Sequence, residues 1–243
     1  MTEQNQKIRL GVFTDAHYSP SELTCNDRFN SLSLQKIREA LEAFREQSVD
    51  ACFCLGDLTD VCETPGEAEK CLDEIAELFH EAQKHYPIYV APGNHDYASW
   101  KRERFFEKLG VPCPPYCVRI KWKDFVFLDA NYDEQMRSFD SVDFRWDEAY
   151  LSPDGIGFLQ AALKDSPDCV VVVHELLDPT LEERHVIRNA EPVRRMLEAG
   201  GNVRLVLQGH YHYGGESVLN GIRYKTFEAM CVGRENHCFV IEL

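Results

Sequence analysis

The sequence contains no hydrophobic run that is long enough to cross a lipid bilayer. No window of the chain approaches the roughly 18 uninterrupted apolar residues that a membrane helix needs. Residues 1–7, with the sequence MTEQNQK, also lack the apolar core of a secretion signal. We therefore expect a cytoplasmic protein that has no membrane partner.

Basic charge is scarce as well. The 243 residues include 26 Lys and Arg against 41 Asp and Glu, which gives a formal net charge of −15. The densest basic stretch, residues 101–108, is interleaved with Glu103 and Glu107 at helical spacing, which is typical of a solvated helix face. Because a nucleic-acid binder needs clustered Lys and Arg to neutralise phosphates, we expect no nucleic-acid partner.

The chain has ten cysteines but lacks the paired C-x-x-C motifs of a structural zinc site. Cys52 and Cys54 lie two residues apart in an apolar run, where they share one face of a strand. Cys113 and Cys117 are separated by two prolines and a tyrosine. Since the chain is long enough to form a hydrophobic core, we expect free thiols that act as buried small hydrophobic side chains.

Apolar segments that alternate with helical patterns predict an α/β fold. Helical periodicity is clearest at residues 32–44, 68–79 and 158–163. Since one α/β core can extend to roughly 250 residues, we expect a single domain over residues 1–243. Runs rich in β-branched residues predict buried strands at residues 8–13, 51–55, 88–91, 125–128, 169–173 and 203–207.

The C-terminal part of the chain has a different pattern. Three short strand-like segments follow Gly214, at residues 216–219, 222–227 and 238–241, and Asn220-Gly221 separates the first two. Asn-Gly between strand-like runs is a strong hairpin signal, so we expect antiparallel strands to close the fold. Residues 130–153 show no clear period and are expected to form a loop that is either functional or disordered.

Polar clusters follow five of the predicted strands. Because the carboxyl ends of strands in an open α/β sheet face one crevice, we expect these clusters to converge there. An extended backbone projects residues i and i+2 to one side, so Asp15 and His17, or His210 and His212, can flank one ion. The clusters are Asp15-Ala-His17, Gly56-Asp57-Leu-Thr-Asp60, Gly93-Asn94-His95-Asp96, His174-Glu175 and Gly209-His210-Tyr-His212.

These residue types predict a two-metal site. Imidazoles, carboxylates and one amide oxygen without thiolate suit Mn, Fe, Co or Zn better than Ca or Mg, and two ions can share one carboxylate. Asp57 is the natural bridge, and the net positive charge of such a centre suits a phosphate oxyanion. The candidate ligands are Asp15, His17, Asp57, Asn94, His174, His210 and His212.

Several other polar residues are not expected to bind the metals. Glu175 and Asp96 are interpreted as supporting or helix-capping groups next to the ligands. Four further histidines have no such neighbours in the sequence, and we interpret them as ordinary helix or surface residues: His80, His85, His185 and His237.

Taken in order, the motifs D-x-H, G-D-x-x-D, G-N-H-D, a strand-end His and G-H-x-H resemble the signature of the calcineurin-like metallophosphoesterases, over residues 15–212. The resemblance implies a four-layer α/β/β/α sandwich with two metals that share Asp57. It assigns the general acid to His95 and an orienting carboxylate to Asp60, while Glu175 stands where many relatives have His or Pro. One metal is then held by Asp15, His17, Asp57 and His212, and the other by Asp57, Asn94, His174 and His210.

The predicted activity is hydrolysis of a phosphodiester or phosphoanhydride by metal-activated hydroxide, with His95 protonating the leaving group. A carboxylate on the other ring nitrogen, such as Asp60, favours the acidic form. A G-x-S-x-G nucleophile elbow is absent from the sequence. A phosphoprotein phosphatase is disfavoured, because Val61-Cys62 replaces the Arg-Gly that such enzymes have after the second Asp. A non-catalytic metal-binding scaffold is disfavoured because His95 and every ligand position are filled.

Shorter matches concern the substrate. Asp27-Arg28-Phe29, Leu128-Asp129-Ala130 and residues 209–215 resemble the manganese-dependent ADP-ribose/CDP-alcohol diphosphatases. Arg28 precedes a predicted helix and is a candidate for holding a second phosphate, with a solvated cap residue as the alternative. Phe139, Phe144 and Trp146 are candidates either for stacking a nucleobase or for covering the sheet edge. The expected substrate is small and nucleotide-like; cyclic-nucleotide phosphodiesterase and broad phosphomonoesterase activity remain alternatives, and the sequence leaves the oligomeric state open.

Overall fold

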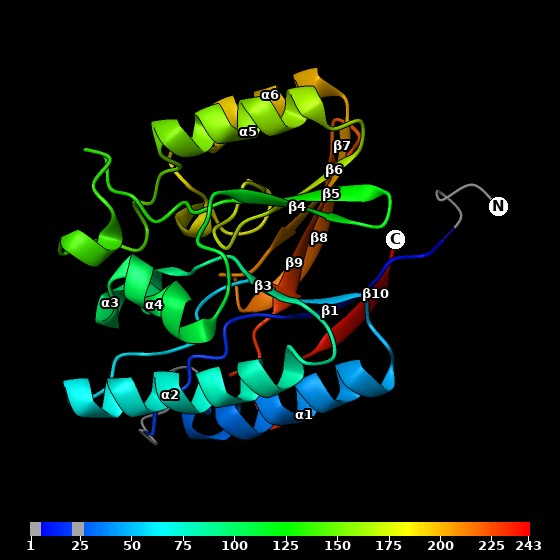
Figure 1. Cartoon of the computed structure of the whole chain (residues 1–243). Helices are drawn as coiled ribbons and strands as arrows, with labels where there is room; N and C mark the ends of the chain where they lie inside the picture. Colours follow the sequence, from blue (N-terminus) through cyan, green and yellow to red (C-terminus); the bar gives the residue numbers. More distant parts are fainter. Residues whose placement is uncertain (1–5, 21–26) are drawn as a thin grey trace.

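The protein folds into two β-sheets that pack face to face, with helices on both outer sides. The structure is a computed structural model and describes residues 6–20 and 27–243. Helices α1 (Ser33–Glu46) and α2 (Pro65–Ala82) cover one sheet, and α5 (Pro153–Asp165) and α6 (Ala190–Gly200) cover the other (Figure 1). The predicted α/β/β/α arrangement is confirmed. Residues 1–5 and Cys25 lie outside the described residues. Residues 1–5 make up most of the N-terminal segment on which the expectation of no secretion signal rests.

The first sheet has the strand order β10-β1-β2-β3. Strands β1 (Arg9–Phe13), β2 (Ala51–Cys54) and β3 (Ile88–Val90) are parallel, and β10 (Phe239–Glu242) runs antiparallel to β1. Burial on both faces of β1 and β2 explains why these strands have continuous apolar sequences rather than alternating ones. Their carboxyl ends all point to the same edge of the sheet.

The second sheet has six strands in the order β4-β5-β6-β7-β9-β8. Strands β5 (Lys123–Phe127), β6 (Cys169–Val172), β7 (Val203–Gln208) and β9 (Ile222–Glu228) are parallel to their neighbours in that row. The outer strands β4 (Tyr116–Ile120) and β8 (Tyr213–Leu219) are antiparallel to β5 and β9.

The C-terminal strands divide between the two sheets. The Asn220-Gly221 hairpin is confirmed, and both residues have positive φ, 50° and 83°, as a tight two-residue turn requires. The expectation of antiparallel closure is correct for β8 and β10 but incomplete, because β9 is also parallel to β7. The last strand therefore joins the first sheet rather than extending the hairpin.

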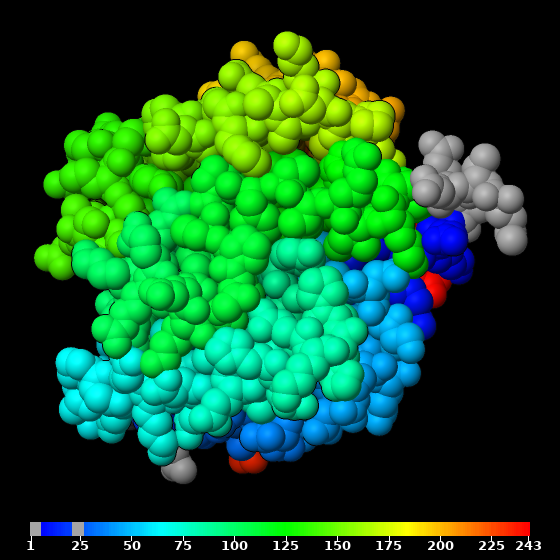
Figure 2. Space-filling view, viewed as in Figure 1, coloured from blue at the N-terminus to red at the C-terminus, as the bar shows by residue number. Residues whose placement is uncertain are grey.

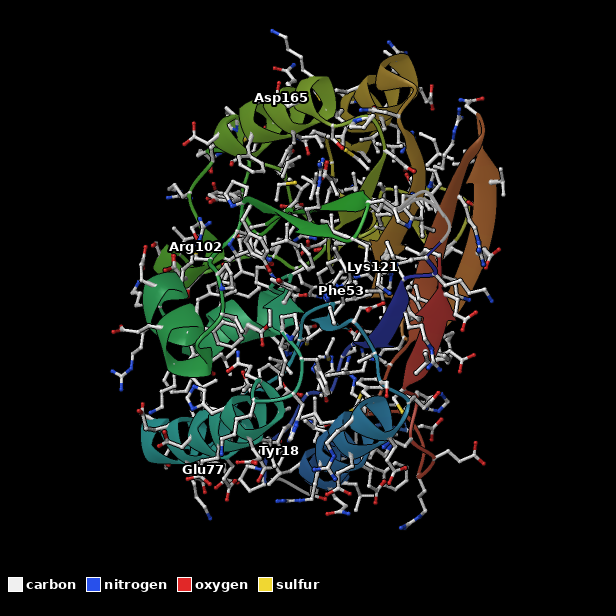
Figure 3. The ribbon with its side chains drawn as sticks, turned by 45° about the vertical axis from the view of Figure 1, so that its right-hand side comes forward. Tyr18, Phe53, Glu77, Arg102, Lys121 and Asp165 are labelled. Atoms are coloured by element: carbon white, nitrogen blue, oxygen red, sulfur yellow. The ribbon has the colours of Figure 1, made fainter. Side chains whose placement is uncertain are left out.

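Side chains from alternate strand positions fill the space between the sheets. Phe53 on β2 meets Phe125 and Phe127 on β5 edge to face, with ring centroids 5.1 and 4.9 Å apart. Figure 3 shows Phe53 at the centre of the molecule, between the two layers of strands. This packing fixes the two sheets relative to each other and so fixes the crevice at their carboxyl ends.

Two short helices, α3 (Asn94–Ser99) and α4 (Arg102–Leu109), connect the sheets at one side. In the space-filling view the green segment that begins with α4 lies between the cyan α2 region and the yellow-green upper helices (Figure 2). The helical spacing of residues 101–108 is confirmed, but the face is less solvated than expected. Arg104 and Lys108 pair with Glu69 on α2, and Phe105 and Phe106 are buried.

The structure tests the expectations for the cysteines and for membrane-crossing helices. Cys52 and Cys54 are buried as predicted, but Cys113 and Cys117 are exposed, because they lie on the short edge segment leading into and along β4. All nine described cysteines are free. Among residues 6–20 and 27–243, none of the helices combines the length and apolar character needed to cross a membrane.

Candidate metal centre

All seven candidate ligands converge where the strands end. Asp15 and His17 follow β1, Asp57 follows β2, and Asn94 begins α3 just after β3. The remaining ligands, His174, His210 and His212, follow β6 and β7 of the second sheet. The site therefore spans the line where the two sheets meet, as expected for strands whose carboxyl ends face one crevice.

Asp57 lies between the two halves of this cluster. Its Oδ2 atom is 3.4 Å from Nε2 of His17 and 3.4 Å from Nε2 of His174. Its other oxygen, Oδ1, accepts a hydrogen bond from the backbone N–H of His95 at 2.8 Å. One carboxylate oxygen is thus held by the backbone, and the other faces histidines from both sheets.

Asp15 is divided in the same way. Its Oδ2 accepts hydrogen bonds from Thr14 Oγ1 at 2.6 Å and from the backbone N–H of His210 at 3.0 Å. Its Oδ1 has no hydrogen-bond partner and lies 3.3 Å from Nε2 of His212. The backbone therefore orients this free oxygen toward the histidines.

Three histidine rings direct their Nε2 atoms toward the centre. Nδ1 of His174 donates to the carbonyl oxygen of Leu55 at 2.6 Å, which leaves Nε2 as the acceptor atom. Nε2 of His17 and Nε2 of His212 approach to 3.2 Å. Two ring nitrogens at this separation suit ligation of one shared cation.

Unpaired buried atoms show that these residues fit metal ions. Four of the candidate ligand atoms are buried without a hydrogen-bond partner, an arrangement that costs free energy unless another group satisfies it. Groups of side chains with ligand atoms within 4.8 Å of one another include Asp15-His17-Asp57 and Asp57-His174-His210, which share Asp57. The four atoms are Asp15 Oδ1, Asn94 Oδ1, His174 Nε2 and His210 Nε2.

Opposite charges decide the protonation of the cluster. Burial opposes ionisation, but the nearby histidines, His174 foremost, hold the pKa of Asp15 and of Asp57 below the usual range. Burial likewise opposes the charged form of His17, but the charge of Asp57 outweighs it and raises the pKa of His17 to about 9. The aspartates are therefore ionised, and a divalent cation can replace the positive charge that the histidines supply.

Backbone strain coincides with the candidate ligands. Asp15, His17, Asp57 and His210 all have positive φ, at 52°, 46°, 50° and 65°. This left-handed region is uncommon for residues other than glycine and is found preferentially at functional sites. The tight turns after three strands place these side chains where an extended strand could not.

Two motif glycines allow the close approach of neighbouring segments. A Cβ atom at Gly93 would overlap Oδ1 of Asp57, and one at Gly209 would overlap Oγ1 of Thr14. The motif glycines therefore have a steric reason that is independent of any motif comparison. Asp96 acts as a cap: its carboxylate accepts hydrogen bonds from the backbone N–H groups of Gly93, Asp57, Leu58 and Thr59.

His95 and Asp60 lie beside the cluster, as the sequence predicted. Nδ1 of His95 lies 2.9 Å from Oδ1 of Asp60, and the His95 side chain is 26% exposed. Asp60 also accepts a hydrogen bond from Asn30 Nδ2 at 2.8 Å and lies 3.9 Å from Arg28. Burial opposes its ionisation, but the adjacent rings of His17 and His95 hold the pKa of Asp60 well below its usual range.

A cavity of about 320 Å³ opens over the candidate metal centre. Arg28 lines it with its side chain 24% exposed, so this arginine faces the site rather than bulk solvent. The cavity also contains five residues of the cluster or next to it: Asp57, Asn94, His95, His210 and His212. Its other lining residues are Trp146, His185, Tyr211, Tyr213 and Val232.

The interpretation of His185 as an ordinary surface histidine is wrong. Its ring centroid lies 4.8 Å from that of His210 and 5.1 Å from that of Trp146, and it lines the cavity. A 3₁₀ turn, Glu183–His185, brings it there, and no motif in the sequence marks that turn. Cys231 was also missed as a neighbour: its sulfur falls within 4.8 Å of ligand atoms of His17 and His212.

The 130–153 loop contributes one of its three aromatic candidates to the cavity. Phe139 is buried and stacks on Phe144, with centroids 4.3 Å apart and an interplanar angle of 6°. Both pack into the main hydrophobic core, so they cover the sheet rather than face the cavity. Trp146 lines the cavity, so among the three it stays the candidate for stacking a nucleobase.

A family model for calcineurin-like phosphoesterases matches residues 8–214 of the chain. This chain belongs to the calcineurin-like phosphoesterase family. The enzyme is accordingly a metal-dependent phosphoesterase, and members of the family typically bind two divalent metals. The described residues contain matching groups of His and Asp side chains.

A curated relative and two solved structures are similar to this chain at low sequence identity. The chain is 26% identical over 157 residues to the 3',5'-cyclic adenosine monophosphate phosphodiesterase CpdA of Haemophilus influenzae; the match covers 63% of this chain and 53% of that protein, about half its length. A dimetal phosphatase from Danio rerio superposes with a TM-score of 0.75 at 18% identity, covering 92% of this chain and 88% of that one. Purple acid phosphatase from yellow lupin superposes with a TM-score of 0.58 at 14% identity, covering 93% of this chain and 44% of that one. At these identities the structural likeness establishes the fold alone.

Proposed function

We propose that the phosphoesterase cleaves a phosphodiester or phosphoanhydride bond of a small, nucleotide-like substrate at a centre of two divalent transition metals. The proposal rests above all on Asp57, whose Oδ2 is equidistant from His17 and His174 on opposite sheets. It treats residues 1–243 as one domain.

The donor set divides into two groups around Asp57. Asp15, His17 and His212 would hold one ion with it, and Asn94, His174 and His210 would hold the other. Nitrogen and oxygen donors in these numbers suit Mn, Fe, Zn or Co. When bound, the two ions polarise the phosphoryl oxygens and make a water molecule a stronger nucleophile.

His95 supplies the proton for the leaving oxygen. The ring lines the cavity, and Nδ1 is bonded to Asp60, so Nε2 is free to carry the proton toward the substrate. Asp60 orients the ring through this contact. The Asn30 amide in turn holds the second oxygen of Asp60, which restricts rotation of the carboxylate.

Arg28 is positioned to bind a second phosphate. Its guanidinium lies 3.9 Å from Asp60, at the same side of the cavity as His95. A phosphate beside the leaving oxygen would meet this group, which favours a diphosphate over a simple monoester. A nucleoside diphosphate derivative such as ADP-ribose is the expected substrate.

Cyclic-nucleotide hydrolysis is the second candidate. The similarity to a cyclic AMP phosphodiesterase favours it. In a cyclic monophosphate the leaving oxygen belongs to the same sugar, so no second phosphate is present and Arg28 would have no such partner. The two candidates therefore make different predictions for Arg28.

A metal-reconstituted substrate panel tests the proposal. The Mn²⁺-loaded protein is assayed with five substrates, and kcat/KM is compared between them: ADP-ribose, a CDP-alcohol, cyclic AMP, bis(nitrophenyl) phosphate and nitrophenyl phosphate. We expect the diphosphates to be cleaved far better than the monoester. A preference for cyclic AMP over every diphosphate would favour the second candidate, and a preference for the monoester would contradict both.

A further inference from the structure

We propose that four aromatic side chains that line the cavity, Trp146, His185, Tyr211 and Tyr213, form a binding surface for the nucleobase of the substrate and so favour nucleotides over phosphate esters that have no base. We call this set the aromatic wall. The inference rests on the proposed function, because it assigns a place to the organic part of a phosphorylated substrate. It concerns residues that lie outside the candidate metal ligands and the acid.

The aromatic wall is continuous. Ring centroids lie 5.1 Å apart for Trp146 and His185, 5.4 Å for His185 and Tyr211, and 5.7 Å for Tyr211 and Tyr213. It begins at the metal centre, since His185 and Trp146 both contact the ring of His210. It ends at the cavity mouth with Tyr213. A flat substituent attached to a phosphate at the metals can therefore lie along it.

Three separate segments build this surface. Trp146 comes from the long loop, His185 from the turn between β6 and α6, and the two tyrosines from the G-H-x-H motif and the start of β8. Tyr97 and Tyr224, in contrast, are buried in the core. Tyr213 is 69% exposed, the highest value among the large hydrophobic side chains of residues 6–20 and 27–243. An exposed aromatic ring at the mouth of a cavity gains from covering by a ligand.

Charged residues contact the tryptophan and its neighbour in the loop. The Arg184 guanidinium lies 4.9 Å from the Trp146 ring centroid. Arg184 and Arg145 both pair with Asp147, at 3.4 and 3.2 Å. These contacts fix the loop next to Trp146, so the ring is positioned before any ligand binds.

The two sides of the cavity differ in chemistry. Arg28 and His95 lie next to Asp60, which follows the first sheet, and supply positive charge and a proton that suit phosphate oxygens. The aromatic wall begins instead at His210, which follows the second sheet, and offers aromatic rings. Stacking between a base and an aromatic side chain tolerates any base, because every base has a π-face. We therefore expect affinity for nucleotides of several bases rather than selection of one.

The test compares two ligands that differ only in the base. AMP and ribose 5-phosphate carry the same phosphomonoester, so both can bind the metals, and only AMP can stack. Each is measured as a competitive inhibitor of bis(nitrophenyl) phosphate hydrolysis. We expect AMP to bind about 10- to 100-fold more tightly, and we expect Trp146→Ala or Tyr213→Ala to reduce that ratio toward one.

Tryptophan fluorescence gives a second measurement that does not require turnover. Zn²⁺-loaded protein is titrated with AMP, which should quench Trp146 when the base stacks on it. Trp146→Phe should abolish the quenching, and Trp122→Phe, a matched control outside this cavity, should preserve it. Because Tyr213 is largely solvent-exposed, Tyr213→Ala keeps the test valid if Trp146→Ala does not fold.

The possible failures are distinguishable. If the wild-type chain hydrolyses no phosphate ester in any metal form, the proposed function fails. If it hydrolyses bis(nitrophenyl) phosphate but binds AMP and ribose 5-phosphate equally, the aromatic wall does not bind the base, and the phosphohydrolase proposal stands. Equal AMP binding by wild type and by both variants, Trp146→Ala and Tyr213→Ala, would also overturn the inference.

Discussion

Nδ1 of His95 lies 2.9 Å from Oδ1 of Asp60, at the edge of a cluster of buried histidines and carboxylates. This contact orients the ring and leaves Nε2 facing the cavity. The His95–Asp60 contact lies apart from the cluster around Asp57. In the proposed function, the cluster binds the cations and His95 donates the proton.

Removing the Asp60 charge should weaken this proton donation. We expect Asp60→Asn to lower kcat about 10- to 100-fold for a diphosphate substrate, as is usual for groups that orient a catalytic histidine. Since Asp60 Oδ2 is also 3.5 Å from His17 Nδ1, metal content is measured in parallel. An unchanged kcat with full metal content would remove Asp60 from this role.

The rate loss caused by removing the proposed acid, His95, should depend on the leaving group of the substrate. We expect His95→Ala to keep its metal and to lose about 10²- to 10⁴-fold in rate on a substrate with a poor leaving group. Nitrophenolate leaves without protonation, so the loss on bis(nitrophenyl) phosphate should be much smaller. Equal losses on both substrates would show that His95 stabilises transition-state charge instead.

Arg28→Ala should distinguish diphosphates from other esters. We expect kcat/KM to fall for ADP-ribose and to stay near wild type for bis(nitrophenyl) phosphate, which has no second phosphate. Arg234→Ala is the matched control, because Arg234 lies over Phe29 and does not line the cavity. Equal losses on both substrates in Arg28→Ala would exclude the arginine from substrate selection.

Two glycine substitutions test the close approach of backbone segments. Gly93→Ala should abolish or strongly weaken metal binding, because the new Cβ would overlap Oδ1 of Asp57. Gly157→Ala on α5 has no atom within 4 Å of its new Cβ and should stabilise the fold by about 0.5–1 kcal/mol. Thermal unfolding and elemental analysis of both variants measure the two effects. Normal metal content in Gly93→Ala would contradict the steric argument.

The sequence predicted the strands and the ligand cluster because both depend on local patterns. Strands buried on both faces have continuous apolar sequences, and polar residues directly after them must lie at the carboxyl edge of a sheet. The structure brings all seven candidate ligands together there and places Asp57 between histidines of the two sheets, while its bridging role stays a prediction. The left-handed backbone at Asp15 and Asp57 was not visible in the sequence, since neither is a glycine.

Tertiary contacts account for what the sequence could not predict. His185 reaches the cavity through a turn between β6 and α6 that has no apolar period and no motif. Cys113 and Cys117 were expected to be buried, but β4 is an edge strand with alternating exposure. Phe139 and Trp146 belong to one loop and share an aromatic character, yet only the fold decides which is buried and which lines the cavity.

The central claim is that Asp57 bridges two ions, and elemental analysis of metal-reconstituted protein tests it most directly. After loading with Mn²⁺ and removal of free metal, we expect about two ions per wild-type chain. Asp57→Ala should lose both, because the remaining ligands of each ion are then incomplete, while a circular dichroism spectrum confirms that the chain is folded. One ion or none in the wild type, or the loss of only one ion in folded Asp57→Ala, would contradict the account.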